Sequence, residues 1–165
     1  MTQKTNLAAG RSYLAIPGPS VIPDEVLQAM HRPSPNIYEG ELINMMPALV
    51  SDLKRVARTR HNVAMYIGNG HAAWEAALGN TIAPGEKVLV PASGMFARDW
   101  AALAEKLGAE AQVLDFGLSS PFNIEPVSDA LKADTGHEIK AVLAVHVDTS
   151  SSIRNDIASL RAALD

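Results

Sequence analysis

A short turn at residues 68–72, which reads Gly-Asn-Gly-His-Ala, has the residue types of a ligand-binding turn. It follows the apolar run 63–67 and leads into a segment with helical apolar spacing. Glycine lets a backbone approach a ligand closely, and the first N–H groups of a helix can point at an anion. A phosphate group is therefore a natural ligand. For this turn alone, a tight turn without any ligand is an equally good interpretation.

The turn departs from the glycine pattern of dinucleotide-binding proteins. That pattern has a third glycine three positions after the second, and in this sequence Ala73 stands there. A nucleotide is therefore not the favoured phosphate compound.

Beyond residue 60, short apolar runs alternate with amphipathic segments. The predicted strands are residues 63–67, 87–90, 112–114 and 141–145, and the predicted helices are residues 71–80, 96–107, 126–133 and 157–164. Strands that are apolar throughout and alternate with helices indicate a parallel sheet covered on both faces. The predicted fold class is α/β, a mostly parallel sheet with helices on both faces.

Ligands of such sheets bind at the carboxyl ends of the strands. Four segments are predicted to lie there, at residues 68–71, 92–96, 115–119 and 146–152. The candidate site is therefore expected where these segments meet.

The amino-terminal part has a different character. Residues 1–20 read as an N-terminal arm, because closely spaced prolines hold the backbone extended. Helices are predicted at residues 24–30 and 41–58, with a kink at Pro47. A chain of 165 residues is long enough for one well-buried core. The predicted organisation is an arm followed by one domain at residues 21–165.

Composition argues against several classes of partner. The formal net charge is -4 and charges of both signs are interspersed, so neither nucleic acid nor an anionic membrane is an expected partner. The sequence has no cysteine, which excludes disulfides and zinc–thiolate sites, and no metal site is predicted. No apolar run approaches the roughly 18 residues of a membrane span. A cytoplasmic protein with small-molecule or protein partners is expected.

Four motifs follow one another along the chain, and together they are more specific than any one of them. They are residues 16–20 (Ile-Pro-Gly-Pro-Ser), 68–78 with 84–90, 93–97 (Ser-Gly-Met-Phe-Ala) and 146–152 (His-Val-Asp-Thr-Ser-Ser-Ser). In order and spacing they resemble the class V pyridoxal-phosphate aminotransferases of the alanine–glyoxylate and serine–glyoxylate group. The likeness covers nearly the whole chain from about Tyr13. It implies the amino-terminal portion of a fold type I transferase large domain.

The resemblance also implies a cofactor, pyridoxal 5'-phosphate, and residues that bind it. The backbone at Gly70, His71 and Ala72 would hold the phosphate. Phe96 would stack on the pyridine ring, and Thr149 would hydrogen-bond near the ring hydroxyl. Each position has a structural alternative: Phe96 as core, His71 as a helix cap, and Thr149 as part of a hydroxyl-rich loop that caps the next helix.

The same resemblance implies residues on the substrate side and a reaction. Pro17 and Gly18 belong to a loop that is similar to the substrate-side loop of the family. The expected activity is amino-group transfer from a small amino acid to glyoxylate or another α-keto acid, in a homodimer with its active site at the subunit interface. A lyase or desulfurase of the same fold, and a non-catalytic phosphate-binding module, are the alternatives.

The sequence departs from the family pattern at three places. Asn69 stands where a serine or threonine is usual, and Ser152 replaces the glycine of the last motif. Residues 35–40 lack the common His-Arg-Ser-Pro pattern. These departures concern the phosphate contacts, the last loop and the amino donor.

Transamination needs a lysine that forms an internal Schiff base with the cofactor. Lys87 and Lys140 are predicted at the amino ends of strands, across the sheet from the glycine turn. Three lysines are predicted on helices, where lysines are usually solvated, and the last lies in the arm: Lys54, Lys106 and Lys132, and Lys4. None of them is suited to the role, and the resemblance places the lysine beyond the predicted strand 141–145. The chain is therefore expected to be truncated, to hold no catalytic residue and to be inactive by itself.

Overall fold

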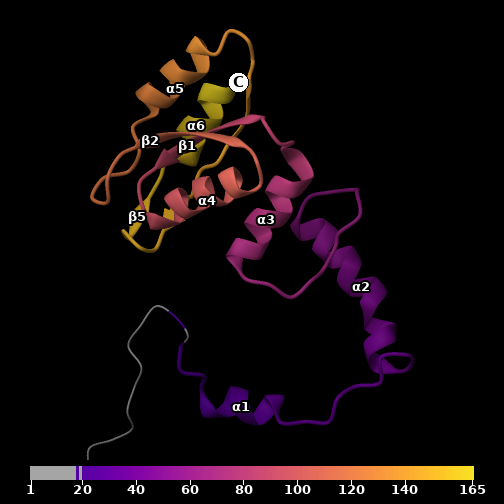
Figure 1. Cartoon of the computed structure of the whole chain (residues 1–165). Helices are drawn as coiled ribbons and strands as arrows, with labels where there is room; N and C mark the ends of the chain where they lie inside the picture. The colour runs from indigo at the N-terminus through magenta and orange to yellow at the C-terminus, as the bar shows by residue number, and fades with distance from the viewer. Residues whose placement is uncertain (1–17, 19) are drawn as a thin grey trace, which may run out of the picture. The chain divides into compact units, whose positions relative to one another are not determined.

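The computed structural model describes residue 18 and residues 20–165 (Figure 1). The chain divides into two compact units, Met1–Met65 and Tyr66–Asp165. Each unit is described by itself. Most of the predicted arm, including Pro17, lies outside the described residues, and Gly18 is exposed.

The first unit contributes two helices, α1 (Asp24–Met30) and α2 (Glu41–Val56). Two acids in the first turn of α1 match the helix dipole, and Pro47 lies inside α2. Both predicted helices are confirmed, α2 with an end two residues earlier than expected. Neither helix has a buried residue within the described part of the chain.

The second unit is built on a three-stranded parallel sheet. Its strands are β1 (Lys87–Ala92), β2 (Glu110–Asp115) and β3 (Ile139–Val142), in the order β2-β1-β3. Its helices are α3 (Gly70–Thr81), α4 (Met95–Lys106), α5 (Ile124–Ala133) and α6 (Ile157–Leu164). The predicted α/β class with a parallel sheet is confirmed.

Helices cover both faces of the central strand β1. Successive side chains of a strand point to opposite faces of the sheet, so neighbouring residues of β1 pack against different helices. Val88 and Val90 pack with Leu78 of α3 and with the alanines of α4. Leu89 packs on the other side with Val127 of α5 and Leu160 of α6. Figure 1 shows this layering, with α4 on one side of β1 and α5 and α6 on the other. The core therefore lies in two layers around β1.

The prediction of a strand at residues 63–67 is wrong. These residues form no strand, and the side chains of Met65, Tyr66 and Ile67 are exposed. A strand needs a neighbour that shares its N–H and C=O groups, and no strand of the described chain pairs with this run. Its apolar composition was therefore not enough to make it a strand.

The last predicted strand, residues 141–145, is displaced toward the amino terminus. β3 ends at Val142, although the N–H of Leu143 still donates to the carbonyl of Leu89 at 2.8 Å. The following loop contains an antiparallel pair that the sequence did not predict, β4 (Val147–Asp148) and β5 (Ile153–Arg154). Strands of two residues are too short to show a periodic pattern.

Asp134 ends α5 and holds the start of β3. Its carboxylate accepts hydrogen bonds from the N–H groups of Ile139 at 2.8 Å and Glu138 at 2.9 Å. These two bonds, that of Ile139 first, lower the pKa of Asp134. A carboxyl whose pKa is lower in the folded chain stabilises the fold above its unfolded pKa, and this stabilisation is lost as the pH falls through the folded value.

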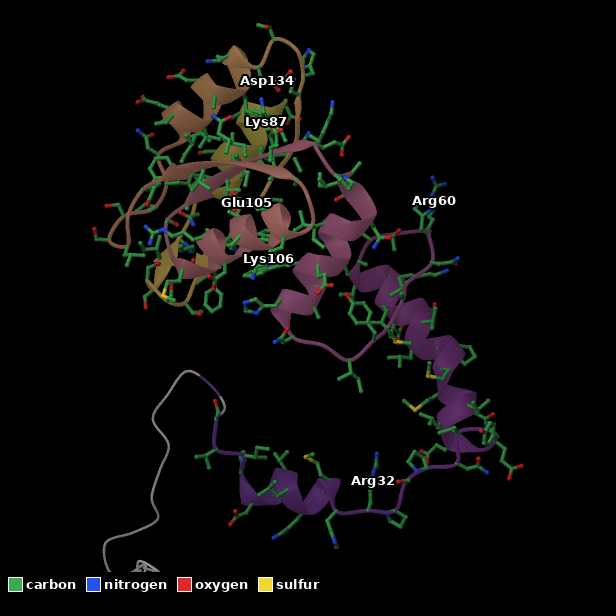
Figure 2. The ribbon with its side chains drawn as sticks, viewed as in Figure 1. Arg32, Arg60, Lys87, Glu105, Lys106 and Asp134 are labelled. Atoms are coloured by element: carbon green, nitrogen blue, oxygen red, sulfur yellow. The ribbon has the colours of Figure 1, made fainter. Side chains whose placement is uncertain are left out.

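We expect Asp134→Asn (Asp134 is labelled in Figure 2) to lower the free energy of unfolding at neutral pH and to flatten its decline toward acid pH. Denaturant unfolding measured across the acid range checks this. Asp129→Asn, an exposed position on α5, is the matched control. An unchanged acid dependence in Asp134→Asn would contradict the role of the two backbone bonds.

Candidate functional site

The segments that follow the three parallel strands meet at one edge of the sheet, as predicted. The N–H of Phe116, just after β2, donates to the carbonyl of Ala92 at 2.8 Å. The hydroxyl of Ser151, beyond β3, donates to the carbonyl of Ser93 at 3.0 Å. Hydrogen bonds therefore tie the carboxyl ends of the strands into one surface.

Asn155 is the main polar connection at this edge and was missed in the sequence. It is 2% exposed, and its amide donates to the Ser93 hydroxyl at 2.8 Å and to the Val145 carbonyl at 2.7 Å. Its side-chain oxygen accepts from the N–H of Phe122 at 3.0 Å. One buried side chain therefore joins the segments after β1, after β2 and after β3.

The glycine turn leads into α3, as predicted. Asn69 is the N-cap, and its side chain accepts a hydrogen bond from the N–H of Ala72 at 3.2 Å. The N–H groups of Gly70 and His71 have no hydrogen-bond partner in the described part of the chain. Of the three predicted phosphate-binding N–H groups, that of Ala72 is used by the cap and the other two are available.

The two glycines of the turn have different surroundings. A Cβ atom on Gly68 would lie 2.8 Å from the Cβ of Ala72, which is too close for any residue but glycine. A Cβ atom on Gly70 would meet nothing within 4 Å. Packing therefore explains Gly68, whereas the space over Gly70 is open to a ligand.

Electrostatics distinguish the start of α3 from the other helix starts of this unit. α3 has a neutral cap and no acid in its first turn. α5 has Glu125 in its first turn, and α6 is capped by Asp156, whose pKa is lowered by the Ser159 hydroxyl and N–H. The start of α4 contacts the carboxylate of Asp148. Of the four helices of this unit, α3 is therefore the one whose positive end has no carboxylate at its cap or in its first turn.

An aromatic cluster lies beside the glycine turn. The His71 ring is 4.7 Å from that of Trp74 and 6.0 Å from that of Phe96, measured between ring centroids. Trp74 meets Phe96 edge to face at 6.1 Å and stacks on Trp100 at 5.2 Å. The structure therefore brings together Phe96 and the turn, two features that the sequence assigned to one site.

Thr149 lies in the exposed turn of the β4–β5 hairpin (residues 147–154), between Asp148 and Ser150. Both of these neighbours bond to the first turn of α4, which carries Phe96. Ser152, in the same turn, has a positive φ of 58°. This backbone conformation favours glycine, the residue that the family motif has at this position.

A pocket of about 460 Å³ lies between α3 and α4 and begins at the glycine turn. Its lining residues are Asn69, His71, Ala72, Glu75, Asp99, Ala102, Leu103 and Lys106. Lys106, which Figure 2 labels, therefore shares a pocket with His71. From the sequence, this lysine is predicted only to lie on a helix.

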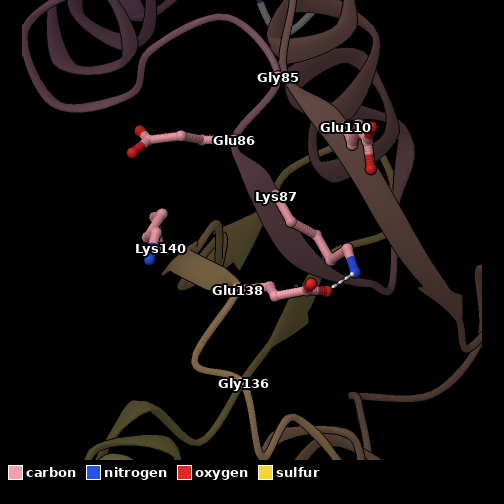
Figure 3. Close-up of a pocket in the computed structure, with 7 residues that line it drawn as sticks. All are labelled: Gly85, Glu86, Lys87, Glu110, Gly136, Glu138 and Lys140. Carbon is pink, nitrogen blue, oxygen red and sulfur yellow. Dashed lines mark hydrogen bonds and ion pairs between the residues drawn. The ribbon is translucent and has the colours of Figure 1, made fainter.

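Lys87 and Lys140 lie at the opposite edge of the sheet, as predicted. They line a pocket of about 350 Å³ at the amino ends of β1 and β3 (Figure 3). The Lys87 ammonium donates to Glu138 at 2.8 Å, and this hydrogen bond raises the pKa of Lys87. A lysine that stays protonated is a poor nucleophile, so Lys87 is unsuited to Schiff-base chemistry.

No family model matches the chain. Among curated proteins, it is 35% identical over 157 residues to the serine–glyoxylate aminotransferase of Methylorubrum extorquens, covering 94% of this chain and 39% of that protein. It is 32% identical to the L-aspartate–glyoxylate aminotransferase of Paracoccus denitrificans, covering 91% of this chain and 38% of that protein. The chain thus spans about two fifths of the length of these relatives.

The chain is also similar to part of aminotransferases among solved structures. The ureidoglycine–glyoxylate aminotransferase of Bacillus subtilis matches 89% of this chain with a TM-score of 0.73 and 26% identity, over 38% of its own chain. An aspartate aminotransferase of Thermus thermophilus matches 92% of this chain with a TM-score of 0.74 and 28% identity, over 42% of its own chain.

Fold and relatives together show that the chain is similar to the corresponding part of aminotransferases. The family predicted from the four motifs, the class V aminotransferases, is confirmed. The share of the relatives that the chain covers fits the predicted portion of a longer enzyme. In the described residues, no helix combines the length and apolar character needed to cross a membrane.

Gly94 provides a test of the packing at this edge. A Cβ atom on Gly94 would clash with the carboxyl group of Asp148, whereas one on Gly79 of α3 would meet nothing within 4 Å. We expect Gly94→Ala to lower the free energy of unfolding by about 1–3 kcal/mol through overpacking. Gly79→Ala, the matched control, is expected to raise it by about 1 kcal/mol because alanine favours a helix interior. Equal stabilities of the two variants in denaturant unfolding would contradict the close approach.

Proposed function

We propose that the whole protein transfers an amino group from a small amino acid to glyoxylate or another α-keto acid, with pyridoxal 5'-phosphate as cofactor. The observation that carries this proposal is the pair of available N–H groups at Gly70 and His71, beside Phe96, in a chain similar to glyoxylate aminotransferases. Relatives named for serine, L-aspartate and alanine support a small amino donor.

The residues present fit the cofactor. A phosphate is an anion, and the start of α3 offers two N–H donors, the positive end of a dipole and open space over Gly70. Phe96 lies within one aromatic cluster with His71, so a flat ring beside the turn would find an aromatic surface. The donor set therefore suits a phosphate attached to an aromatic ring.

Each residue has a defined task in this proposal. Gly70 and His71 bind the phosphate through their backbone, Phe96 stacks on the pyridine ring, and Thr149 hydrogen-bonds near the ring hydroxyl. The cofactor, when bound, supplies an electron sink for the bonds at the substrate α-carbon. Pro17 and Gly18 contribute to the substrate side of the site, and the enzyme is a homodimer.

Proline at position 70 tests the role of a single N–H group. Gly70 is the first residue of α3, where proline is tolerated, and Asn69 already has the extended backbone that proline requires before it. We expect Gly70→Pro to weaken pyridoxal phosphate binding by about tenfold to a hundredfold, because a hydrogen bond to a charged group contributes ~1.5–3 kcal/mol. Quenching of Trp74 and Trp100 fluorescence measures the affinity, and denaturant unfolding verifies the fold.

Gly70→Ala is the matched control, because it adds a Cβ atom but keeps the N–H. Any difference between the two variants therefore isolates the hydrogen bond. Equal affinities of Gly70→Pro and Gly70→Ala for pyridoxal phosphate would argue against phosphate binding by this N–H group. Tighter binding of nucleotides than of pyridoxal phosphate to the unmodified chain would favour a nucleotide module instead.

The Schiff-base lysine is proposed to lie outside these 165 residues. We expect that pyridoxal phosphate followed by borohydride leaves no stoichiometric lysine adduct on the purified chain, as measured by intact-mass and peptide mass spectrometry. A sample without borohydride is the control. A stoichiometric adduct on Lys106, which lines the pocket next to the turn, would show that this chain holds its own Schiff-base residue.

A further inference from the structure

The first turn of α4 has no cap of its own. Its N-cap residue is Gly94, which has no side chain to accept a hydrogen bond from the helix. The first N–H groups of a helix have no partner within the helix, so their acceptors must come from elsewhere.

The β4–β5 hairpin supplies these acceptors from more than 50 residues away. The hydroxyl oxygen of Ser150 accepts from the N–H of Met95 at 2.9 Å, and a carboxylate oxygen of Asp148 accepts from the N–H of Ala97 at 3.3 Å. The Ser150 hydroxyl in turn donates to the other carboxylate oxygen of Asp148 at 2.5 Å, and the Ser150 N–H donates to that second oxygen at 3.1 Å. The two side chains therefore act as one unit on the helix start.

The carboxylate of Asp148 depends on this contact. Asp148 is 0% exposed, and no cationic side chain of the described residues forms an ion pair with it. A buried charge is costly unless it is compensated, and here the compensation comes from N–H donors and the positive end of α4. The close approach of Gly94 to Asp148 makes room for this arrangement.

Phe96 lies between the two anchored N–H groups of Met95 and Ala97. Its backbone is therefore fixed on both sides by the hairpin, and its ring meets Trp74 edge to face. We propose that Asp148 and Ser150 are positioning residues, which hold the first turn of α4 so that the Phe96 ring is oriented for the aromatic ring of the cofactor. The inference rests on the proposed function, because the ring that Phe96 would face is that of pyridoxal phosphate.

Ser150→Ala tests the anchor and Ser151→Ala is its matched control. Ser151 lies in the same turn, but its hydroxyl donates to the carbonyls of Ser93 and Asp148 and not to α4. Ser150→Thr keeps a hydroxyl and is expected to preserve the anchor. Any general loosening of the hairpin should therefore affect both alanine variants, and a specific effect only Ser150→Ala.

The first measurement needs no ligand. Amide hydrogen exchange by NMR is expected to speed up at Met95 in Ser150→Ala, with a shift of the Trp74 indole signal, and to stay unchanged in Ser151→Ala and Ser150→Thr. Unchanged exchange at Met95 and an unchanged Trp74 signal in Ser150→Ala would overturn the inference, whatever the chain binds.

The second measurement compares two probes, pyridoxal phosphate and inorganic phosphate. Inorganic phosphate needs only the start of α3, whereas pyridoxal phosphate also needs the oriented ring. Ser150→Ala is expected to weaken pyridoxal phosphate binding about threefold to tenfold and to leave inorganic phosphate binding unchanged. In Ser150→Ala combined with Phe96→Leu, the loss is expected to equal that of Phe96→Leu alone, because one residue acts through the other.

Outcomes of this comparison separate the two proposals. Equal losses for both probes, or additive losses in the double variant, would overturn the positioning role and leave a structural one. An unmodified chain that binds neither probe would refute the proposed cofactor site, while the hydrogen-exchange result would still decide whether the hairpin holds Phe96.

Discussion

Parallel pairing around a fully buried central strand is the constraint on which the rest of the second unit depends. Residues 88–92 of β1 are buried, with β2 and β3 parallel on either side. Because all three strands run the same way, their carboxyl ends share one edge. Segments distant in the sequence, such as the α4 start and the β4–β5 hairpin, are brought together there. The candidate site is therefore a consequence of strand direction.

Polar groups at that edge fall into two sets, those that are hydrogen-bonded within the chain and those that are free. Asn155 and Asp148 are buried and satisfy neighbouring backbone groups, so they make the edge rigid. The start of α3, by contrast, keeps the N–H groups of Gly70 and His71 available. A rigid surround with one group of free donors is the arrangement that suits a bound anion, because the donors need not reorganise to meet it.

The aromatic cluster connects the start of α3 to the helix interface behind it. Trp74 of α3 contacts Phe96 and stacks on Trp100 of α4, so the ring beside the turn rests on the packing between the two helices. Phe96 is thus contacted both at its backbone and at its ring. The hairpin anchors its backbone, and the tryptophans support its ring.

Local pattern in the sequence was sufficient for much of this protein. The apolar period predicted the helices within a few residues, and α6 at its observed bounds. The alternation of apolar runs with helical segments predicted the α/β class, and four ordered motifs predicted the family. The helices and the glycine turn are predictable because helical spacing and turn conformation are set by neighbouring residues.

Tertiary structure decided everything that depends on a partner distant in the sequence. Residues 63–67 are apolar but form no strand, because a strand exists only with a neighbour. Asp148, Ser150 and Asn155 looked like ordinary loop residues, and only the fold shows what they hold. The sequence by itself predicted the turn that we propose for the phosphate, because a glycine turn before a helix is a local pattern. The side chains that bond to the first turn of α4 were found only in the fold, because their contacts are long-range.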